Sequence, residues 1–233
     1  MELRQLFDPT SSTYTYLLWD KKTREAALVD SVREQIERDS TLIRELSLDL
    51  KYLLETHIHA DHITGAGELR KRFGAKSVVH RNSDAECPDI LVEGGERLMV
   101  GENSIEVLFT PGHTNTDVSY LIDGAVLTGD ALLIRGSGRT DFQSGDAGTA
   151  YDSITEKLFT LTDDTLVYPA HDYHGHTVSS IGEEKAVNPR LGNHANREDY
   201  IKLMDSLLLD KPKLIDEAVP GNLACGLARQ DGE

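Results

Sequence analysis

The order of apolar and polar positions predicts a chain of short strands interrupted by a few helices. Strand-forming residues fill Thr13–Asp20, and Glu25–Asp30 follows a turn-like Asp-Lys-Lys-Thr, so the two segments are predicted to pair as a hairpin. Apolar runs or period-2 alternation predict six further strands, at residues 50–55, 76–80, 104–110, 118–122, 125–130 and 165–168. Asp123-Gly124 is a strong turn signal between two of these strands.

Apolar positions three and four residues apart predict helices at residues 31–46, 66–73, 149–161 and 198–209. Asp30 or Ser31 is the expected cap of the first helix. The sequence shows no fixed-period repeat and no linker rich in Pro, Gly or Ser. We therefore expect a single domain over residues 1–233, with a short C-terminal helical extension from about residue 190.

Composition narrows the classes of function. The net charge of −16 argues against binding to nucleic acid, whose phosphates need a basic surface. No apolar run reaches 18 residues, and the first residues lack the basic flank and apolar stretch of a signal peptide, so neither a membrane span nor export is expected. The two cysteines, Cys87 and Cys225, lie far apart and do not suggest a disulfide scaffold, so we expect a reducing, cytoplasmic environment.

Chemistry-bearing side chains gather where predicted strands end. The segment from His57 to His62 holds three imidazoles and the carboxylate of Asp61 directly after the strand at residues 50–55. Three other strands end at His113, Asp130 and His171. Imidazole is the commonest protein ligand of first-row metals, so these positions predict a metal centre at one end of the strands.

The pattern His57-x-His59-x-Asp61-His62, followed by His113, Asp130 and His171, resembles that of the metallo-β-lactamase superfamily. The resemblance implies an α/β (α+β) fold, a four-layer αββα sandwich with metal at one edge of two facing sheets. In that superfamily these positions can serve two metal sites. The glyoxalase II thioesterases use the full set for a dinuclear centre. One site would then use His57, His59, His113 and bridging Asp130, and the other Asp61, His62, Asp130 and His171.

A narrower resemblance concerns Gly138-Arg-Thr-Asp-Phe-Gln143, which is similar to the signature of the persulfide dioxygenases. Asn188-Pro-Arg-Leu191 and Asn222-Leu-Ala-Cys-Gly226 also look like this branch. Ser137 stands where some members carry cysteine. The resemblance implies one Fe²⁺ per chain, held by two histidines and a carboxylate.

Mapped onto this sequence, the three iron ligands are His57, His113 and Asp130. Three protein ligands on octahedral iron leave room for a sulfur substrate and O2 together. The resemblance then makes the other four candidates supports of these ligands through hydrogen bonds, or alternatively ligands of a second metal. These four are His59, Asp61, His62 and His171.

The implied reaction converts glutathione persulfide, O2 and water into sulfite and glutathione. Tyr173 matches a glutathione-contacting tyrosine of the related thioesterases, the alternative being a tyrosine that only packs its ring. Arg190 could pair with a glutathione carboxylate or form a structural salt bridge. Arg139 is expected to order the signature loop, with Asp141 as an ion-pair partner. Cys225 is either a thiol that handles persulfide sulfur or a buried structural cysteine.

Three hypotheses follow for the whole chain. The leading one is a mononuclear iron persulfide dioxygenase, and the second is a dinuclear thioesterase of the glyoxalase II type. The third is a non-catalytic metal-binding or sulfur-carrier module of the same fold. For the first, we expect a possible homodimer and a functional link to a rhodanese or a sulfide:quinone oxidoreductase, with no nucleic-acid or membrane partner.

Overall fold

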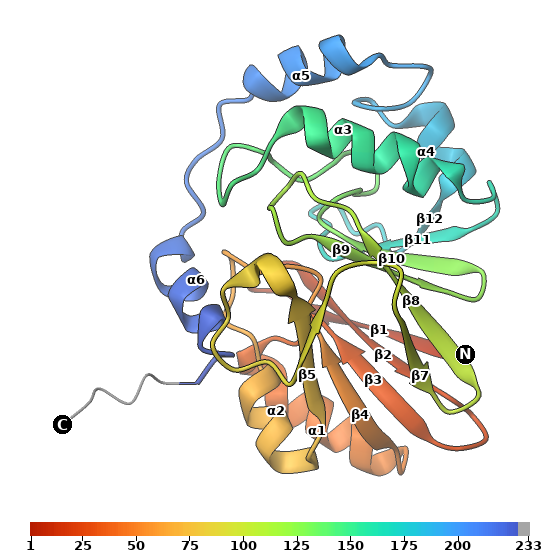
Figure 1. Ribbon diagram of the computed structural model, residues 1–233, viewed down its shortest axis with the longest axis vertical. Helices are drawn as coiled ribbons and strands as arrows, with labels where there is room; N and C mark the ends of the chain where they lie inside the picture. Colours follow the sequence, from red (N-terminus) through yellow and green to blue (C-terminus); the bar gives the residue numbers. More distant parts are fainter. Residues whose placement is uncertain (228–233) are drawn as a thin grey trace. The chain divides into compact units, whose positions relative to one another are not determined.

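The computed structural model describes residues 1–227 and divides the chain into two compact units, each with its own sheet and core (Figure 1). The first unit comprises Met1–Val92, Leu98–Ser104 and Lys211–Glu233. The second comprises Glu93–Arg97 and Ile105–Asp210. The single domain expected from the sequence stays a prediction, and the two units are described separately.

The first sheet has the strand order β1-β2-β3-β4-β5-β6. Its strands are β1 Glu2–Asp8, β2 Thr13–Trp19, β3 Glu25–Val29, β4 Asp49–Leu54, β5 Lys76–His80 and β6 Ile90–Val92. The first three pair antiparallel, and β3 to β6 pair parallel. Because β3, β4 and β5 run in one direction, their carboxyl ends meet at one edge of the sheet, where the histidine segment begins.

Helices α1 Ile36–Glu45 and α2 Ala66–Phe73 cover one face of this sheet, and α6 Ile215–Leu223 belongs to the same unit (Figure 1). The core of the unit lies between sheet and helices, where Leu17 of β2 and Leu28 of β3 meet Ile43 of α1 and Leu69 of α2. Every residue of β2 is buried, so both faces of this strand are covered.

The second sheet has the order β12-β11-β10-β9-β8-β7. Its strands are β7 Arg97–Val100, β8 Asn103–Phe109, β9 Val118–Ile122, β10 Ala125–Gly129, β11 Leu166–Pro169 and β12 Ser179–Ser180. Strands β8, β9 and β10 pair antiparallel, whereas β10 and β11 pair parallel. The carboxyl ends of β10 and β11 therefore lie side by side.

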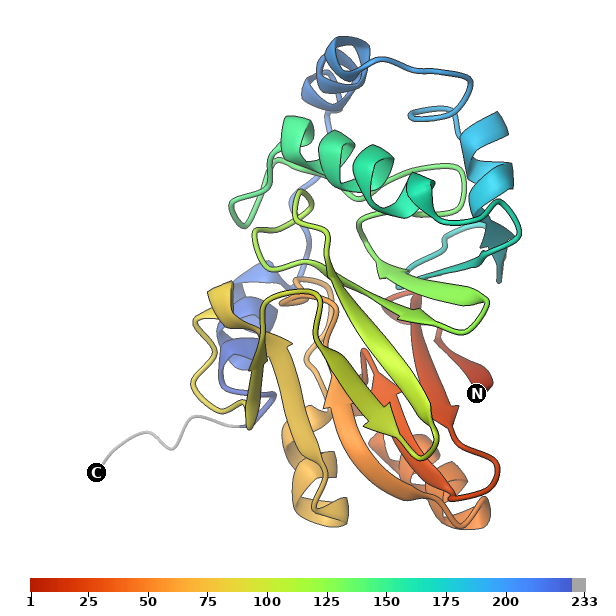
Figure 2. The same ribbon diagram turned by 45° about the vertical axis from the view of Figure 1, so that its right-hand side comes forward.

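Helices α3 Ala147–Glu156, α4 Ile181–Val187 and α5 Arg197–Asp205 belong to the second unit, and Figure 2 shows α3 running along its sheet. Ile154 of α3 and Tyr200 of α5 pack with Val126 of β10 and Val167 of β11 in one buried cluster. Each unit thus supplies one mixed sheet and one layer of helices.

Most predicted elements are present, but the start of the first helix was predicted wrongly. The helix expected from residue 31 begins as a 3₁₀ turn at Arg33–Gln35 and becomes α-helical at Ile36, and neither segment has a side-chain cap. Asp30 does not cap the helix because its carboxylate binds Thr56 instead, and its backbone takes the left-handed conformation at φ 52°. The helix expected over residues 149–161 ends at Glu156, with a 3₁₀ turn at Leu158–Thr160 after it.

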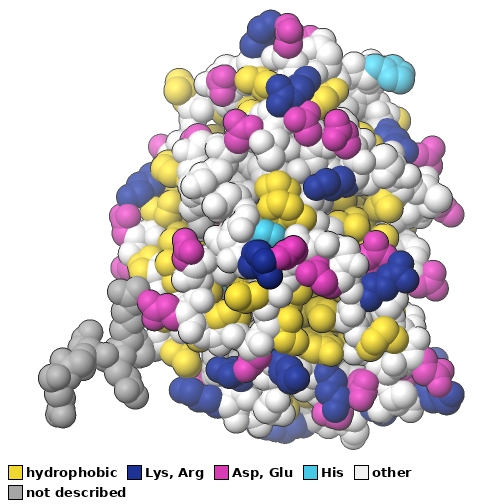
Figure 3. Space-filling view, in the orientation of Figure 1, with side chains coloured by type: hydrophobic (Ala, Val, Ile, Leu, Met, Phe, Trp, Pro, Cys, Tyr) yellow, Lys and Arg dark blue, Asp and Glu magenta, His cyan; other side chains and the backbone are white. Residues whose placement is uncertain are grey.

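Acidic and basic side chains are mixed over the face shown in Figure 3, and no patch of a single sign dominates it. Among the described residues, no helix is long and apolar enough to cross a membrane.

Replacing Leu17 by alanine tests the first core. Its side chain is fully buried, so the variant leaves a cavity and should lose about 2–5 kcal/mol of the free energy of unfolding. The chain has one tryptophan, Trp19, which lies in the same core and reports urea unfolding of this unit by fluorescence. Leu91→Ala, at a half-exposed position, is the control and should change the value by about 0.5 kcal/mol or less. Equal losses in the two variants would contradict this assignment of the core.

Candidate metal centre

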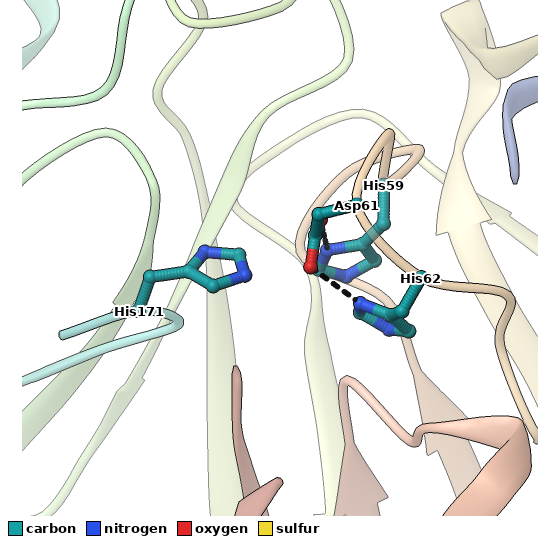
Figure 4. Close-up of side chains that lie close together, drawn as sticks. All are labelled: His59, Asp61, His62 and His171. Atoms are coloured by element: carbon teal, nitrogen blue, oxygen red, sulfur yellow. Dashed lines mark hydrogen bonds and ion pairs between the residues drawn. The ribbon is translucent and has the colours of Figure 1, made fainter. Parts of the chain in front are cut away.

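The histidine segment forms a buried loop between β4 and α2 in the first unit. His57, His59 and His62 are all nearly inaccessible to solvent, whereas Asp61 is partly exposed. Figure 4 shows Asp61 close to the imidazole rings of both His59 and His62. The predicted cluster of donors in this loop is therefore present in space as well as in sequence.

Asp30, at the end of β3, fixes the beginning of this loop. The Thr56 amide donates to Asp30 Oδ1 at 2.7 Å, and the Thr56 hydroxyl donates to Oδ2 at 2.9 Å. The same hydroxyl oxygen lies 3.0 Å from His57 Nδ1. Because its single hydrogen goes to Asp30, this oxygen accepts a hydrogen bond from His57 Nδ1–H. His57 thus has its lone pair on Nε2, the form that ligates a metal through this nitrogen.

His59 is surrounded by carboxylates. Its Nε2 lies 3.1 Å from Asp30 Oδ1 and 3.6 Å from Glu55 Oε2, and its Nδ1 lies 3.9 Å from Asp61 Oδ1. Burial lowers the pKa of His59, but the nearby charges, that of Asp30 above all, outweigh burial and raise this pKa to about 9. The charge of Asp30 therefore favours the imidazolium form of His59, whereas burial raises the pKa of Glu55 to about 8 and favours its neutral form.

Asp61 and His62 form a second small group with the first residue of β2. His62 Nδ1 lies 2.9 Å from Asp61 Oδ2, and Thr13 Oγ1 lies 3.2 Å from the same carboxylate oxygen and 3.3 Å from the His62 ring. A hydrogen bond to a carboxylate fixes the orientation of an imidazole ring, which is the supporting role expected of these residues.

In the second unit the ends of the parallel strands bring Asp130 and His171 together. Gly129 pairs with Pro169 in the register of β10 and β11, so Asp130, one residue after this pair, and His171, two residues after it, leave the sheet at the same edge. His171 Nδ1 donates to Asp130 Oδ1 at 2.7 Å, while His113 Nε2 lies 3.6 Å from Asp130 Oδ2. Asp130 thus lies between the two imidazoles.

The main chain holds His113. Its Nδ1 lies 2.7 Å from the carbonyl oxygen of Arg139, which can only accept, so Nδ1 carries a hydrogen and Nε2 is the nitrogen through which His113 can bind a metal. Asp117 closes the turn after His113, accepting from the amide and the hydroxyl of Thr114 at 2.7 and 2.6 Å. Burial raises the pKa of Asp117 to about 6.

The signature loop lies directly against these ligand candidates. The Gly138 amide donates to the Asp130 carbonyl at 2.7 Å, and a Cβ at residue 138 would lie 2.3 Å from that oxygen and 2.9 Å from the His113 ring. A glycine is therefore required for this approach. Arg139 forms the expected bidentate ion pair with Asp141, at 2.7 and 2.8 Å, and this guanidinium lowers the pKa of Asp141.

Two expected glutathione contacts lie elsewhere in the second unit. Tyr173 is 68% exposed, with its ring parallel to that of His171 at a centroid distance of 6.1 Å. Arg190 Nη1 donates to the Ser137 carbonyl at 2.6 Å, so this arginine helps to order the signature loop. Within the described part of the chain Arg190 forms no ion pair with a carboxylate, so the structural salt bridge considered for it is not seen.

The cysteines require a correction. Cys225, considered as a reactive thiol, forms a disulfide with Cys87, and the described residues contain no free cysteine. The sequence distance of 138 residues hid this pairing, because α6 returns the chain to the first unit. Cys87 and Cys225 are therefore both structural, and the cysteine usage no longer argues for a reducing compartment.

Sequence reasoning missed several residues that shape the site. Asp30 had been assigned to a helix cap, and Glu55, Asp117 and Asn222 had been given no role. Asp30 and Glu55 follow the buried strands β3 and β4 directly, and a carboxylate directly after a buried strand was the signal that could have found them.

The donor set fits a transition metal. Imidazole and carboxylate side chains lie at strand ends in both units. In the first unit, Asp30, Glu55 and His59 each offer one potential ligand atom, and these three atoms lie within 4.8 Å of one another. His57 and His113 each hold a hydrogen on Nδ1, which leaves a lone pair on Nε2. Metal binding is therefore supported, because an imidazole whose Nδ1–H is held by an acceptor presents Nε2 in a fixed direction as a ligand.

Comparison with known proteins identifies the family. The model of the metallo-beta-lactamase superfamily matches residues 8–171, so the chain belongs to this superfamily. It is 50% identical to the mitochondrial persulfide dioxygenase ETHE1 of Homo sapiens over 228 residues, which are 97% of this chain and 89% of the human protein. The crystal structure of ETHE1 from Myxococcus xanthus is 54% identical, with a TM-score of 0.95 over 97% of this chain and all of that one.

The chain therefore belongs, within the superfamily, to the persulfide dioxygenase family and is an oxidoreductase. The predicted metallo-β-lactamase fold of the α+β class is confirmed. Glyoxylase B2 of Dictyostelium discoideum is more distant, at 29% identity over 93% of this chain and 88% of that protein.

Replacing Thr56 by valine tests the support of His57. Valine keeps the shape of the side chain but removes the hydroxyl that joins Asp30 to His57 Nδ1, so the dissociation constant for Fe²⁺ should rise about 10- to 100-fold. Competition with a chelator under anaerobic conditions measures it. Thr155→Val, which removes a hydroxyl hydrogen-bonded within α3, is the control. Unchanged iron affinity in the Thr56 variant would contradict the proposed hydrogen-bond chain.

A methyl group at residue 138 should disturb Asp130 and His113 together, because no space exists for it. Gly138→Ala should therefore weaken metal retention at least about tenfold. Gly136→Ala is a matched control in the same loop, since a Cβ there meets nothing closer than 3.9 Å. Metal content after gel filtration measures the retention. Equal metal content in the two variants would show that the close approach of Gly138 to Asp130 and His113 is unimportant for metal binding.

Proposed function

We propose that the chain oxidises glutathione persulfide with O2 and water to sulfite and glutathione, using one Fe²⁺ held by His57, His113 and Asp130. The balanced reaction is GSSH + O2 + H2O → GSH + SO3²⁻ + 2H⁺. The observation that carries the proposal is the contact of the persulfide dioxygenase signature with two of these residues: Gly138 binds the Asp130 carbonyl, and the Arg139 carbonyl binds His113.

When bound, an iron ion would supply the redox chemistry that allows O2 to react with sulfur. The protein supplies the ligands and their orientation. His57 and His113 offer Nε2, because Nδ1 of each carries its hydrogen toward an oxygen acceptor. Asp130 keeps one carboxylate oxygen for the His171 hydrogen bond and holds the other near His113. His171 in this role orients the carboxylate rather than binding the metal.

His59, Asp61 and His62 complete the proposal as supports of the first unit. The His59 ring contacts Asp30, and the His62 ring contacts Asp61. Contacts of this kind hold the loop that carries His57 in place. The same residues are the donors that a dinuclear thioesterase would use, so metal stoichiometry is the decisive quantity.

Glutathione is the proposed carrier of the persulfide. Tyr173 exposes most of its surface beside His171, which suits a contact with a bound peptide. Arg190 is fixed through Nη1 to Ser137, and a guanidinium held in this way has further donors for a carboxylate. A Tyr173→Phe variant with a raised KM for glutathione persulfide and little change in kcat would agree with this role.

The central test combines metal analysis with oxygen uptake. The wild-type chain should contain one iron, and it should consume O2 only when glutathione persulfide is added. Asp130→Ala removes the carboxylate between His113 and His171, so iron content and O2 consumption should both fall at least about 100-fold. Asp123→Ala, in the exposed turn between β9 and β10, is the matched control and should behave as wild type.

Two other outcomes point to the alternatives. Two metal ions per chain, with hydrolysis of S-lactoylglutathione and no oxygen uptake, would establish the dinuclear thioesterase. One metal ion with no turnover of any persulfide would favour the non-catalytic module. Full activity of Asp130→Ala would overturn the ligand assignment itself.

The oligomeric state, the partner enzymes and the location of the protein are further parts of the proposal. The homodimer, the functional link to a rhodanese or a sulfide:quinone oxidoreductase, and the cytoplasmic location stay predictions from the sequence. Sedimentation equilibrium tests the homodimer, and fractionation of cells that express the chain tests the location.

A further inference from the structure

Helix α6 brings one buried side chain against the backbone of the histidine loop. Asn222, near the end of α6, donates from Nδ2 to the carbonyls of His59 and His62, both at 2.9 Å. Its Oδ1 accepts from the Thr64 amide at 2.8 Å. One buried amide side chain therefore satisfies three backbone groups within six residues of this loop.

The segment after Asn222 is tied to the rest of the first unit by two backbone hydrogen bonds. The Glu86 amide donates to the Leu223 carbonyl, and the Gly67 amide donates to the Cys225 carbonyl, both at 2.9 Å. The disulfide between Cys87 and Cys225 adds a covalent link, with the two Cα atoms 6.2 Å apart.

The Cys87 side of this link is itself firmly placed. Cys87 lies two residues before Asp89, whose carboxylate accepts from the Ser77 amide of β5 at 2.9 Å and pairs with Arg70 of α2. The disulfide therefore connects the end of α6 to the edge of the first sheet and not to a second loose segment.

The chain turns back sharply after Cys225. Gly226 has φ 70°, and a Cβ there would lie 2.0 Å from the Thr64 carbonyl oxygen, so only glycine permits this approach. Cys225 itself has φ 55°, a left-handed conformation that is unfavourable for a residue with a Cβ. Such a conformation persists only where the surrounding structure holds it.

We propose that Asn222 is a positioning residue for the metal centre, and that the Cys87–Cys225 disulfide holds Asn222 on the histidine loop. With the disulfide formed, the carbonyls of His59 and His62 have fixed places, and the loop that carries His57 is held in one conformation. With the disulfide reduced, the end of α6 keeps only its hydrogen bonds, and the loop becomes more mobile. Metal retention is then linked to the oxidation state of this pair. The inference rests on the proposed function in that the loop must contribute a metal ligand.

The redox step is an ordinary thiol–disulfide exchange. A thiolate of an external thiol, such as glutathione, attacks one sulfur and breaks the Cys87–Cys225 bond, and a second thiolate resolves the mixed disulfide. The two cysteines gain two electrons and two protons, and the external thiol leaves as its disulfide. Glutathione is a product of the proposed reaction, so the reductant would be present where the enzyme works.

The experiment measures the metal dissociation constant and the hydrogen exchange of the 59–64 amides together, with Co²⁺ and with Fe²⁺. Asn222→Ala should raise the dissociation constant about 10- to 100-fold and speed the exchange of these amides. Asn222→Asp should behave alike, because a carboxylate cannot donate to the two carbonyls. Asn103→Ala is the matched control, since it removes an amide hydrogen bond to Asp20 in the same unit and should leave both readouts unchanged.

The role of the disulfide is read from a double variant, Cys87→Ser with Cys225→Ser. It should weaken metal binding severalfold, reduction of the wild type should have the same effect, and reduction should not alter the double variant. Metal affinity within twofold of wild type in Asn222→Ala would overturn the positioning role. A double variant that binds metal as the wild type does would overturn the role of the disulfide.

Failure of the proposed function gives a different result. If no variant consumes O2 with persulfide, the proposed oxidation is wrong, while Co²⁺ affinity and hydrogen exchange still decide the role of Asn222. If the wild type binds neither metal, hydrogen exchange of the 59–64 amides decides whether Asn222 positions the loop. Equal exchange rates in Asn222→Ala and the wild type would overturn this role.

Discussion

A buried carboxylate, that of Asp30, is the constraint on which the histidine loop depends. The side chain is almost inaccessible to solvent, and an ionised carboxylate in such a place must be compensated by hydrogen bonds or opposite charge. The protein supplies both, through the amide and hydroxyl of Thr56 and the ring of His59. The loop therefore takes one conformation because any other would leave a buried charge without compensation.

In the second unit the pairing of two strands places the metal-ligand candidates. Parallel pairing of β10 and β11 makes Asp130 and His171 neighbours, and the signature loop then closes over them through Gly138. Membership of the persulfide dioxygenase family gives this arrangement its chemical meaning. The segment Gly138–Gln143, which resembles the signature of that family, is the part of the unit that contacts the ligand candidates from the backbone side.

The local pattern predicts eight of the twelve strands in the described residues, together with the metal-ligand candidates that follow them, but it does not predict β1, β6, β7 and β12. The predicted strand at residues 118–122 and the helix at 66–73 are present with the same bounds. What the sequence could not show depends on contacts between distant residues. Asp30 looked like a helix cap because caps are recognised from neighbours alone, whereas its partners Thr56 and His59 lie on the next strand's loop. The Cys87–Cys225 pairing and the place of Asn222 were hidden because no local signal shows where α6 returns.

The two histidines proposed as iron ligands are oriented by different kinds of acceptor. The orientation of His57 depends on the hydroxyl of Thr56 and the carboxylate of Asp30. A single substitution at either position removes one of these groups. His113 depends on the carbonyl of residue 139, which every amino acid provides. Inherited variation is therefore tolerated unequally around the centre. The support of His57 depends on the identity of two side chains, whereas the hydrogen bond that orients His113 depends on the path of the main chain and on the glycine that permits it.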